Sequence, residues 1–234
     1  MEHEHTPEAI RARLTNAPRT SYLRDWVYGG IDGSVTTFAI VTGVGGASLS
    51  HRIILILGVA NLLADGFSMA ASNYLGTRTE LQEAEALRAI EQRHIESNAE
   101  GEREEVRQIF AAKGFAGHDL ERAVATVTAD DVRWIEFMLG EEYGLARATR
   151  SPAAAAAATF SAFIVCGLVP LLPFLFHLPN AFSVSIAMTG CAFFLVGSAR
   201  SKWLLLSWWR AGAETLVLGA IAAALAYGVG WLTR

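Results

Sequence analysis

The chain has 234 residues, of which 52% are hydrophobic and only 18% charged, and its formal net charge is −4. With a mean hydropathy of +0.31 it is too apolar for an ordinary soluble domain of this size. The composition therefore indicates an integral membrane protein whose partner is a lipid bilayer, and we expect no nucleic-acid partner.

The first 25 residues are polar and carry charges of both signs. They contain no apolar core of the kind that a secretory signal requires, and they are not the Arg-rich, acid-poor stretch of a transit peptide. We interpret residues 1–25 as a cytoplasmic N-terminal tail, followed by membrane segments at 26–76 and 151–234.

Five apolar segments are each long enough to cross a bilayer, which takes about 20 helical residues for roughly 30 Å of hydrocarbon. The fold class that we predict is therefore an all-α integral membrane protein with five transmembrane helices. Pro170 and Pro173 should kink or end the third helix. The predicted spans are residues 26–49, 53–75, 153–176, 181–199 and 211–232.

Lys and Arg residues near the spans predict the orientation. Four arginines precede the first span, ten basic residues lie in the segment 77–150, and Arg200, Lys202 and Arg210 fall between the last two spans. Five crossings place all of these on one side and leave Arg52 and Arg234 on the other. We expect the N-terminus and segment 77–150 in the cytoplasm, the C-terminus outside, and a bacterial cytoplasmic membrane as the host.

Carboxylates lie inside two of the predicted spans, Asp32 in the first and Asp65 in the second. A carboxylate at the centre of a membrane helix costs about 2.5 to 3.5 kcal/mol on insertion scales, so it usually has a partner or a task. Met69 shares a helix face with Asp65, four residues away. A carboxylate with a thioether suits a transition metal such as ferrous iron better than magnesium or calcium.

A structural interpretation of the same residues stays open. Asp32 could lie at the membrane interface, Asp65 could hydrogen-bond neighbouring backbone, and Met69 could fill a packing gap. Asn61 could add a neutral oxygen to a metal pathway, although polar packing between helices explains it equally well.

The segment 77–150 holds sixteen of the twenty-three acidic residues. We predict a cytoplasmic three-helix metal-binding insert between spans two and three, with helices over 78–96, 102–113 and 130–147 and a short element at 118–128. A break at 98–101 separates the first two helices, and Gly114 should end the second.

Several potential metal ligands share helix faces within this insert. Carboxylates on one face repel one another unless a cation or solvent screens them, so the pattern favours divalent metal binding, and a merely solvated charged surface is the alternative. The Glu91-x-x-His94 pair also resembles half of a di-iron motif, which needs a second copy that the insert lacks. The candidates are Glu80, Glu83, Glu91 and His94 on one stripe, Glu102 with Glu105, and Met138 with Glu142.

At these residues the chain resembles the vacuolar iron transporter family, in a bacterial-type form. The resemblance is carried by the run from Asp25 to Gly33, the segment from Ala64 to Met69, the Glu-rich insert and the Gly-rich last span. It implies a homodimer of five-span protomers that exports ferrous iron, and often manganese, from the cytosol in exchange for protons, with no prosthetic group and no enzymatic activity. Its cytoplasmic helical domain would bind the metal before translocation.

Position by position, the resemblance implies pathway roles for Asp32 and Met69. It implies metal ligands at Glu91, His94, Glu102, Glu105, Met138 and Glu142. His94 stands where the family usually has glutamate, which implies a steeper pH dependence, and Asn61 stands where some members have an acidic residue. A two-fold axis would combine one Asp and one Met from each protomer, and Gly29-x-x-x-Gly33 would permit close helix approach near Asp32.

Three functional hypotheses follow from the sequence. The preferred one is a membrane exporter of ferrous iron or manganese. The alternatives are a membrane-tethered di-iron ferroxidase, and a metal-responsive membrane scaffold or sensor without transport.

Overall fold

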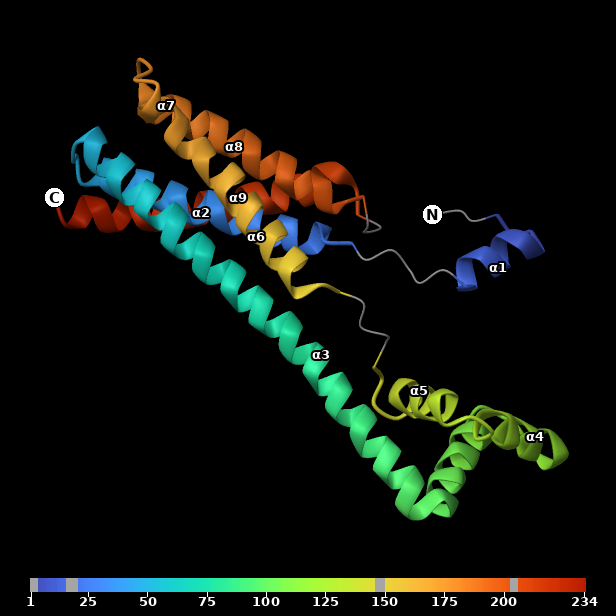
Figure 1. Cartoon of the computed structure of the whole chain (residues 1–234). Coiled ribbons are helices and arrows are strands. Elements are labelled where there is room, and N and C mark those ends of the chain that lie inside the picture. The colour runs from blue at the N-terminus through green and yellow to red at the C-terminus, as the bar shows by residue number, and fades with distance from the viewer. Residues whose placement is uncertain (1–3, 16–20, 146–149, 203–205) are drawn as a thin grey trace. The chain divides into compact units, whose positions relative to one another are not determined.

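The structure is a computed structural model that describes residues 4–15, 21–145, 150–202 and 206–234, and every regular element in these ranges is a helix (Figure 1). The chain forms two compact units. The membrane unit comprises Met1–Tyr74 with Pro152–Arg234, and the insert unit comprises Leu75–Ser151. The helices are α1 (Pro7–Thr15), α2 (Leu23–Gly46), α3 (His51–Ala112), α4 (Gly117–Val127), α5 (Asp131–Glu141), α6 (Pro152–Leu168), the 3-10 helix η1 (Val169–Leu171), α7 (Leu172–Leu175), α8 (Ala181–Arg200) and α9 (Trp208–Leu232).

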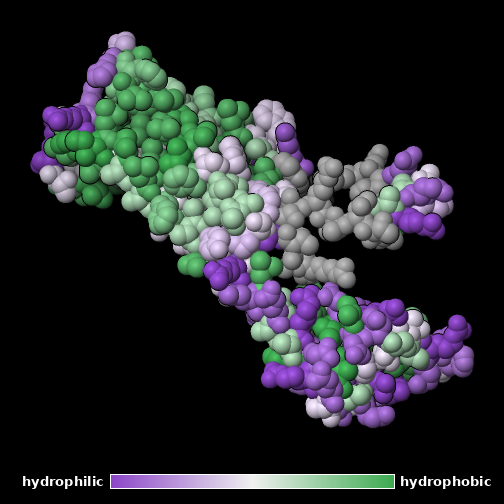
Figure 2. All heavy atoms as spheres, viewed as in Figure 1, coloured by the Kyte–Doolittle hydropathy of each residue, from purple (hydrophilic) through white to green (hydrophobic). Residues whose placement is uncertain are grey.

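Four helical segments in the described ranges are long and apolar enough to cross a membrane. They lie in α3, in Pro152–Leu175, in α8 and in α9, and they match four of the five predicted spans. The first predicted span corresponds to α2, which has 24 residues but falls outside this group of four. Its glycines, threonines and Asp32 make it less apolar, and it packs against α6, α8 and α9. Figure 2 shows hydrophobic residues covering the visible face of the membrane unit and mainly hydrophilic residues covering that of the insert unit.

The α2 glycines contact α6 of the same chain. A Cβ atom at Gly29 would collide with the carbonyl oxygen of Thr159, and one at Gly33 with that of Phe163. These two positions therefore let α2 and α6 approach backbone to backbone. The expected close helix approach at Gly29-x-x-x-Gly33 near Asp32 is therefore confirmed, and the helix that approaches is α6 of the same chain.

The two prolines interrupt the third predicted span as expected. The α-helix ends at Leu168, a 3-10 turn follows over Val169–Leu171, and a single further turn ends at Leu175. Proline removes a backbone donor, so helical hydrogen bonding cannot continue unchanged. The hydroxyl of Ser185 on α8 donates to the carbonyl of Pro170 at 2.7 Å, which satisfies an acceptor at the kink.

Helix α3 is longer than the sequence predicts. The expected boundary after residue 75 is absent, because the helix continues through 75–78 and the Thr79 hydroxyl bonds back to the Leu75 carbonyl at 2.9 Å. The break expected at 98–101 is present, since Asn98 has non-helical φ −148° and ψ 60°. Its side-chain oxygen accepts from the Gly101 amide at 3.2 Å, which caps the following helical segment.

The insert unit has its own apolar core, formed by α3 residues on both sides of the Asn98 break together with α4 and α5. Phe110 stacks on Phe137 with ring centroids 5.0 Å apart. The last helix was expected to reach residue 147 but ends at Glu141, because Gly144 takes φ +65° and the Leu145 amide closes the end by donating to the Leu139 carbonyl. Residues 146–149 lie outside the described ranges. Buried core members are Ile95, Val106, Val124, Trp134, Ile135, Met138 and Leu139.

Candidate metal site and membrane cavity

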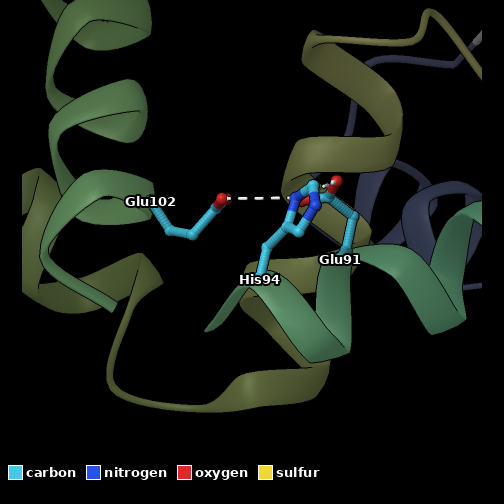
Figure 3. A group of neighbouring side chains, drawn as sticks. All are labelled: Glu91, His94 and Glu102. Carbon is cyan, nitrogen blue, oxygen red and sulfur yellow. Dashed lines mark ion pairs between the residues drawn. The ribbon is translucent and has the colours of Figure 1, made fainter. Parts of the chain in front are cut away.

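Glu91, His94 and Glu102 converge in the insert unit, and each offers a ligand atom within 4.8 Å of the others. The Nδ1 atom of His94 lies 3.5 Å from a Glu102 carboxylate oxygen and 3.8 Å from one of Glu91 (Figure 3). Two carboxylates and an imidazole at these separations could close around one ion with small side-chain movements. In the described ranges this is the one group of three or more His, Cys, Asp or Glu residues that meets this criterion.

The kink at Asn98 creates this convergence. In a straight helix, residues 91 and 102 would be about 16 Å apart along the axis. The non-helical conformation of Asn98 turns the chain, so that Glu102 on the following segment comes close to His94 on the preceding one (Figure 3). Glu91 and His94 are already neighbours at i, i+3.

The two carboxylates are buried without being satisfied. Glu91 is 1% exposed and Glu102 is 6% exposed. The Tyr143 hydroxyl donates to one Glu91 oxygen at 2.9 Å. The other Glu91 oxygen and one Glu102 oxygen have no hydrogen-bond partner among the described residues. Because buried acceptors without partners are costly, these two atoms mark a place where a cation or a proton would stabilise the unit.

Protons compete for the same oxygens. The pKa of Glu102 is raised to about 7, first by burial and then by the carboxylates of Glu105, Glu91 and Glu142, while His94 opposes the shift. The pKa of Glu142 is also raised, by partial burial and then by Glu91 and Glu105. Burial and repulsion between carboxylates thus disfavour the charged forms of Glu102 and Glu142, and both shifts involve Glu91 and Glu105 as neighbours.

The remaining predicted insert ligands occupy different environments. Glu105 and Glu142 are exposed side chains at the edge of the coupled cluster. Met138 is wholly buried in the insert core. Glu80 and Glu83 are exposed on α3 and are not part of the three-residue group.

The sequence analysis missed Tyr143. Its hydroxyl orients Glu91, and burial together with the Glu91 carboxylate raises the pKa of this tyrosine, so it remains a hydrogen-bond donor. Only its position next to Glu142 could have suggested a role.

A cavity of about 890 Å³ lies in the membrane unit beside α2. Asp32 of α2 and Met69 of α3 both line it, so the structure brings together the two residues that the resemblance implies for a pathway. Asp65 is half-buried on α3 and close enough to Asp32 for their charges to interact. The cavity also reaches Arg24 and Arg200.

Asn61, Asp65, Met69 and Asn73 recur at every fourth residue of α3 and form a polar stripe along it. The Asn61 amide donates to the Thr36 hydroxyl at 3.3 Å, and that hydroxyl donates to the Asp32 carbonyl at 2.9 Å. The stripe therefore connects to α2 next to Asp32.

Together these features define a class: an all-helical membrane protein with a carboxylate–imidazole cluster in one unit and a cavity lined by carboxylate and thioether in the other. Carboxylate, imidazole and thioether are ligands for divalent transition metals. The class is therefore that of membrane proteins that handle such metals.

Comparison with known proteins identifies the family. The model of the VIT family matches residues 23–231. The chain is similar to "Vacuolar iron transporter 1" of Arabidopsis thaliana, with 31% identity over 88% of this chain and 83% of that protein. It is also similar to "Vacuolar iron transporter 1" of Oryza sativa subsp. japonica, with 28% identity over 97% of this chain and 89% of that protein. "Vacuolar iron transporter" of Toxoplasma gondii is 31% identical over 92% of this chain and 75% of that protein. The chain therefore belongs to the VIT family, and this membership makes it a membrane metal transporter.

Proposed function

We propose that this protein exports ferrous iron or manganese from the cytosol in exchange for protons. The observation that carries the proposal is the pair of buried carboxylates, Glu91 and Glu102, which each leave an oxygen without a hydrogen-bond partner beside the His94 imidazole. A divalent cation held there would satisfy both oxygens and offset their mutual repulsion. The mixed oxygen and nitrogen donors favour iron or manganese over magnesium.

Proton exchange follows from the same site. Because the pKa of Glu102 is about 7, this carboxyl carries a proton for part of the time at neutral pH. Metal binding needs the deprotonated form, so each binding event would release a proton and acid would release the metal. Glu105 and Glu142 at the edge of the cluster, and the thioether of Met138, would complete the capture site.

In the membrane unit, the metal would pass between Asp32 and Met69, with Asp65 and Asn61 supplying further oxygens along α3. All four belong to or adjoin the cavity and the polar stripe. We propose that two protomers face each other here and that α2 is a fifth span. Exposed small residues on α3 support a close approach by a second copy. They occupy every fourth position beside the polar stripe: Ala60, Ala64, Ser68 and Ser72.

The charge asymmetry supports a cytoplasmic N-terminus and insert with the C-terminus outside. The relatives compared above are named as vacuolar proteins of plants and of a protozoan, and they give no support to the expectation of a bacterial cytoplasmic membrane.

The two alternatives lack a supporting observation. A di-iron ferroxidase of the expected kind needs two Glu-x-x-His elements on packed helices, and the insert has one, Glu91 to His94. A sensor without transport would give no role to the cavity that Asp32 and Met69 line.

Metal uptake into inside-out proteoliposomes tests the proposal. We expect Asp32→Ala to abolish manganese uptake and leave assembly of the protein unchanged, whereas Met188→Leu, a variant on α8, should transport normally. Acidification outside the vesicles should slow uptake. Unchanged uptake by Asp32→Ala would overturn the pathway, and uptake insensitive to an imposed pH gradient would overturn proton exchange.

A further inference from the structure

Tyr143 reaches the metal site from a third part of the insert, just after α5. The backbone beyond it is closed by Gly144, which takes φ +65°, and by the Leu145 amide, which donates to the Leu139 carbonyl at 2.9 Å. The tyrosine side chain is half-buried and packs against the apolar core of the insert. Backbone geometry and core packing therefore hold its hydroxyl in place.

The two oxygens of the Glu91 carboxylate have different surroundings. Oε1 accepts a hydrogen bond of 2.9 Å from the Tyr143 hydroxyl, and the same oxygen lies 3.8 Å from Nδ1 of His94. Oε2 is buried and has no hydrogen-bond partner among the described residues. Because a phenol keeps its proton at neutral pH, the hydroxyl remains a donor and occupies a lone pair of Oε1. Glu91 therefore offers a cation chiefly its Oε2 atom.

A carboxylate that binds through one oxygen suits some cations better than others. Ca²⁺ takes about six to eight oxygen ligands, so it gains from a carboxylate that chelates through both oxygens. Ferrous iron and Mn²⁺ are smaller, and single carboxylate oxygens with an imidazole nitrogen are suitable donors for them. Glu91, His94 and Glu102 supply one imidazole and two carboxylates. Restraint of Glu91 to one oxygen therefore penalises calcium more than iron or manganese.

We propose that Tyr143 is a positioning residue that sets the metal specificity of the insert. Its hydroxyl holds Glu91 to binding through one oxygen and so favours iron and manganese over calcium. Hydrogen-bond partners of metal ligands orient those ligands and tune metal affinity, although they do not touch the ion. This role rests on the proposed function, because it requires that the insert captures metal.

Competition between manganese and calcium for the full chain in detergent tests this role, with free Mn²⁺ measured by its electron paramagnetic resonance signal. We expect the wild type to prefer manganese. Tyr143→Phe removes only the hydroxyl and should lower this preference by about tenfold, the lower end of the effect of losing a hydrogen bond to a metal ligand. Manganese binding should weaken, whereas calcium binding should stay equal or strengthen, because Glu91 becomes free to chelate.

The matched control is Gln92→Met. Gln92 donates to the Glu96 carboxylate at 2.9 Å on the same helix, and neither residue belongs to the metal site. This variant also removes one donor from a carboxylate, but it should keep the wild-type preference for manganese.

Infrared difference spectra of calcium binding give a second measurement. The two stretching bands of a carboxylate lie far apart when one oxygen binds a metal and closer together when both do. Calcium-bound Tyr143→Phe should show a pair of closely spaced bands that the wild type lacks.

Three results would overturn the role of Tyr143. The wild type could bind manganese and calcium equally. Tyr143→Phe could weaken the binding of both metals by the same factor, which would show that the hydroxyl only stabilises the fold. The infrared bands of calcium-bound Tyr143→Phe could match those of the wild type, which would show that Glu91 binds in the same way without the hydroxyl.

Manganese uptake into inside-out proteoliposomes separates this role from export. Excess calcium should slow uptake by Tyr143→Phe more than uptake by the wild type. A metal preference that depends on Tyr143, with no uptake by the wild type, would contradict export and support the role of the tyrosine. Normal uptake by both proteins, with the same metal preference, would support export and contradict the role of the tyrosine.

Discussion

The Asn73 amide donates a hydrogen bond of 2.9 Å to the Asp25 carboxylate, joining α3 to the first turn of α2. Asp25 is only 5% exposed. The same amide nitrogen lies 2.7 Å from the Thr159 hydroxyl of α6, so a single side chain connects three helices of the membrane unit. Asn73 lies one helical turn from Met69, and the connection therefore holds α3 in place beside the cavity.

Asn73→Leu should destabilise the membrane unit by about 1–3 kcal/mol, because it takes a donor away from a buried carboxylate. Thr159→Val should cost less, since the bond to Asp25 survives. Thermal unfolding of the full chain in detergent would measure both. Equal melting temperatures for Asn73→Leu and the wild type would show that the bond contributes nothing.

The raised pKa of Glu102 predicts an unusual pH dependence of the stability of the insert. Its pKa of about 7 in the folded protein exceeds its ordinary value of 4.5. Between these two values the folded state holds a proton that the unfolded state has lost, so the metal-free insert should lose stability as pH rises from about 5 to 7. Glu102→Gln should flatten this dependence, and added manganese should reverse it.

Hydrogen exchange of the insert at several pH values would measure the Glu102 effect. The matched control is Glu104→Gln, two residues away. Glu104 is exposed and bonded to Arg107, which lowers the pKa of its carboxyl, so its contribution should be lost only in acid. A pH profile of Glu102→Gln that matches the wild type would contradict the assignment.

The sequence was a good guide wherever the physical signal is local. Apolar length located four membrane helices, Pro170 and Pro173 marked the interruption of the third predicted span, and the break at residues 98–101 was visible in composition. Helix continuity through residues 75–78 was not predicted, because a change from apolar to charged residues at a glycine resembles a boundary, although Gly76 is accommodated within the helix and no proline is present.

Tertiary relationships could not be read in the same way. Periodicity placed Glu91 and His94 on one face, but the turn at Asn98 that brings Glu102 to them depends on backbone angles that composition does not encode. The Tyr143 bond likewise joins residues 52 positions apart. The glycines of α2 suggested close approach correctly, whereas the partner helix was determined by packing within the chain.

Variants of Met138 test whether this side chain binds metal or only packs in the insert core. It is fully buried in the insert, so Met138→Ala would destabilise by about 2–5 kcal/mol and weaken metal binding indirectly. Met138→Leu keeps the volume and should cost less than about 1.5 kcal/mol. If the thioether binds metal, calorimetry should show weaker iron binding by Met138→Leu at nearly unchanged melting temperature. Val106→Ala, also fully buried, should lower the melting temperature instead, and unchanged iron affinity in Met138→Leu would assign Met138 to the core alone.

Gly33→Ala tests whether the contact between α2 and α6 positions the cavity. The added Cβ atom would meet the backbone of Phe163, with its Cα only 2.9 Å away, and a backbone cannot rotate aside as a side chain can. Overpacking of this kind costs about 1–3 kcal/mol, and the relief must come from moving α2, which carries Asp32 one residue earlier. We expect a lower melting temperature and reduced metal uptake.

At Gly190 on α8 the nearest atom to a new Cβ is the Leu216 side chain at 3.6 Å, an ordinary contact. Gly190→Ala should therefore be neutral or stabilising by about 0.5–1 kcal/mol, as for alanine replacing glycine within a helix. If both variants melt and transport alike, close backbone approach at Gly33 does not determine where Asp32 lies.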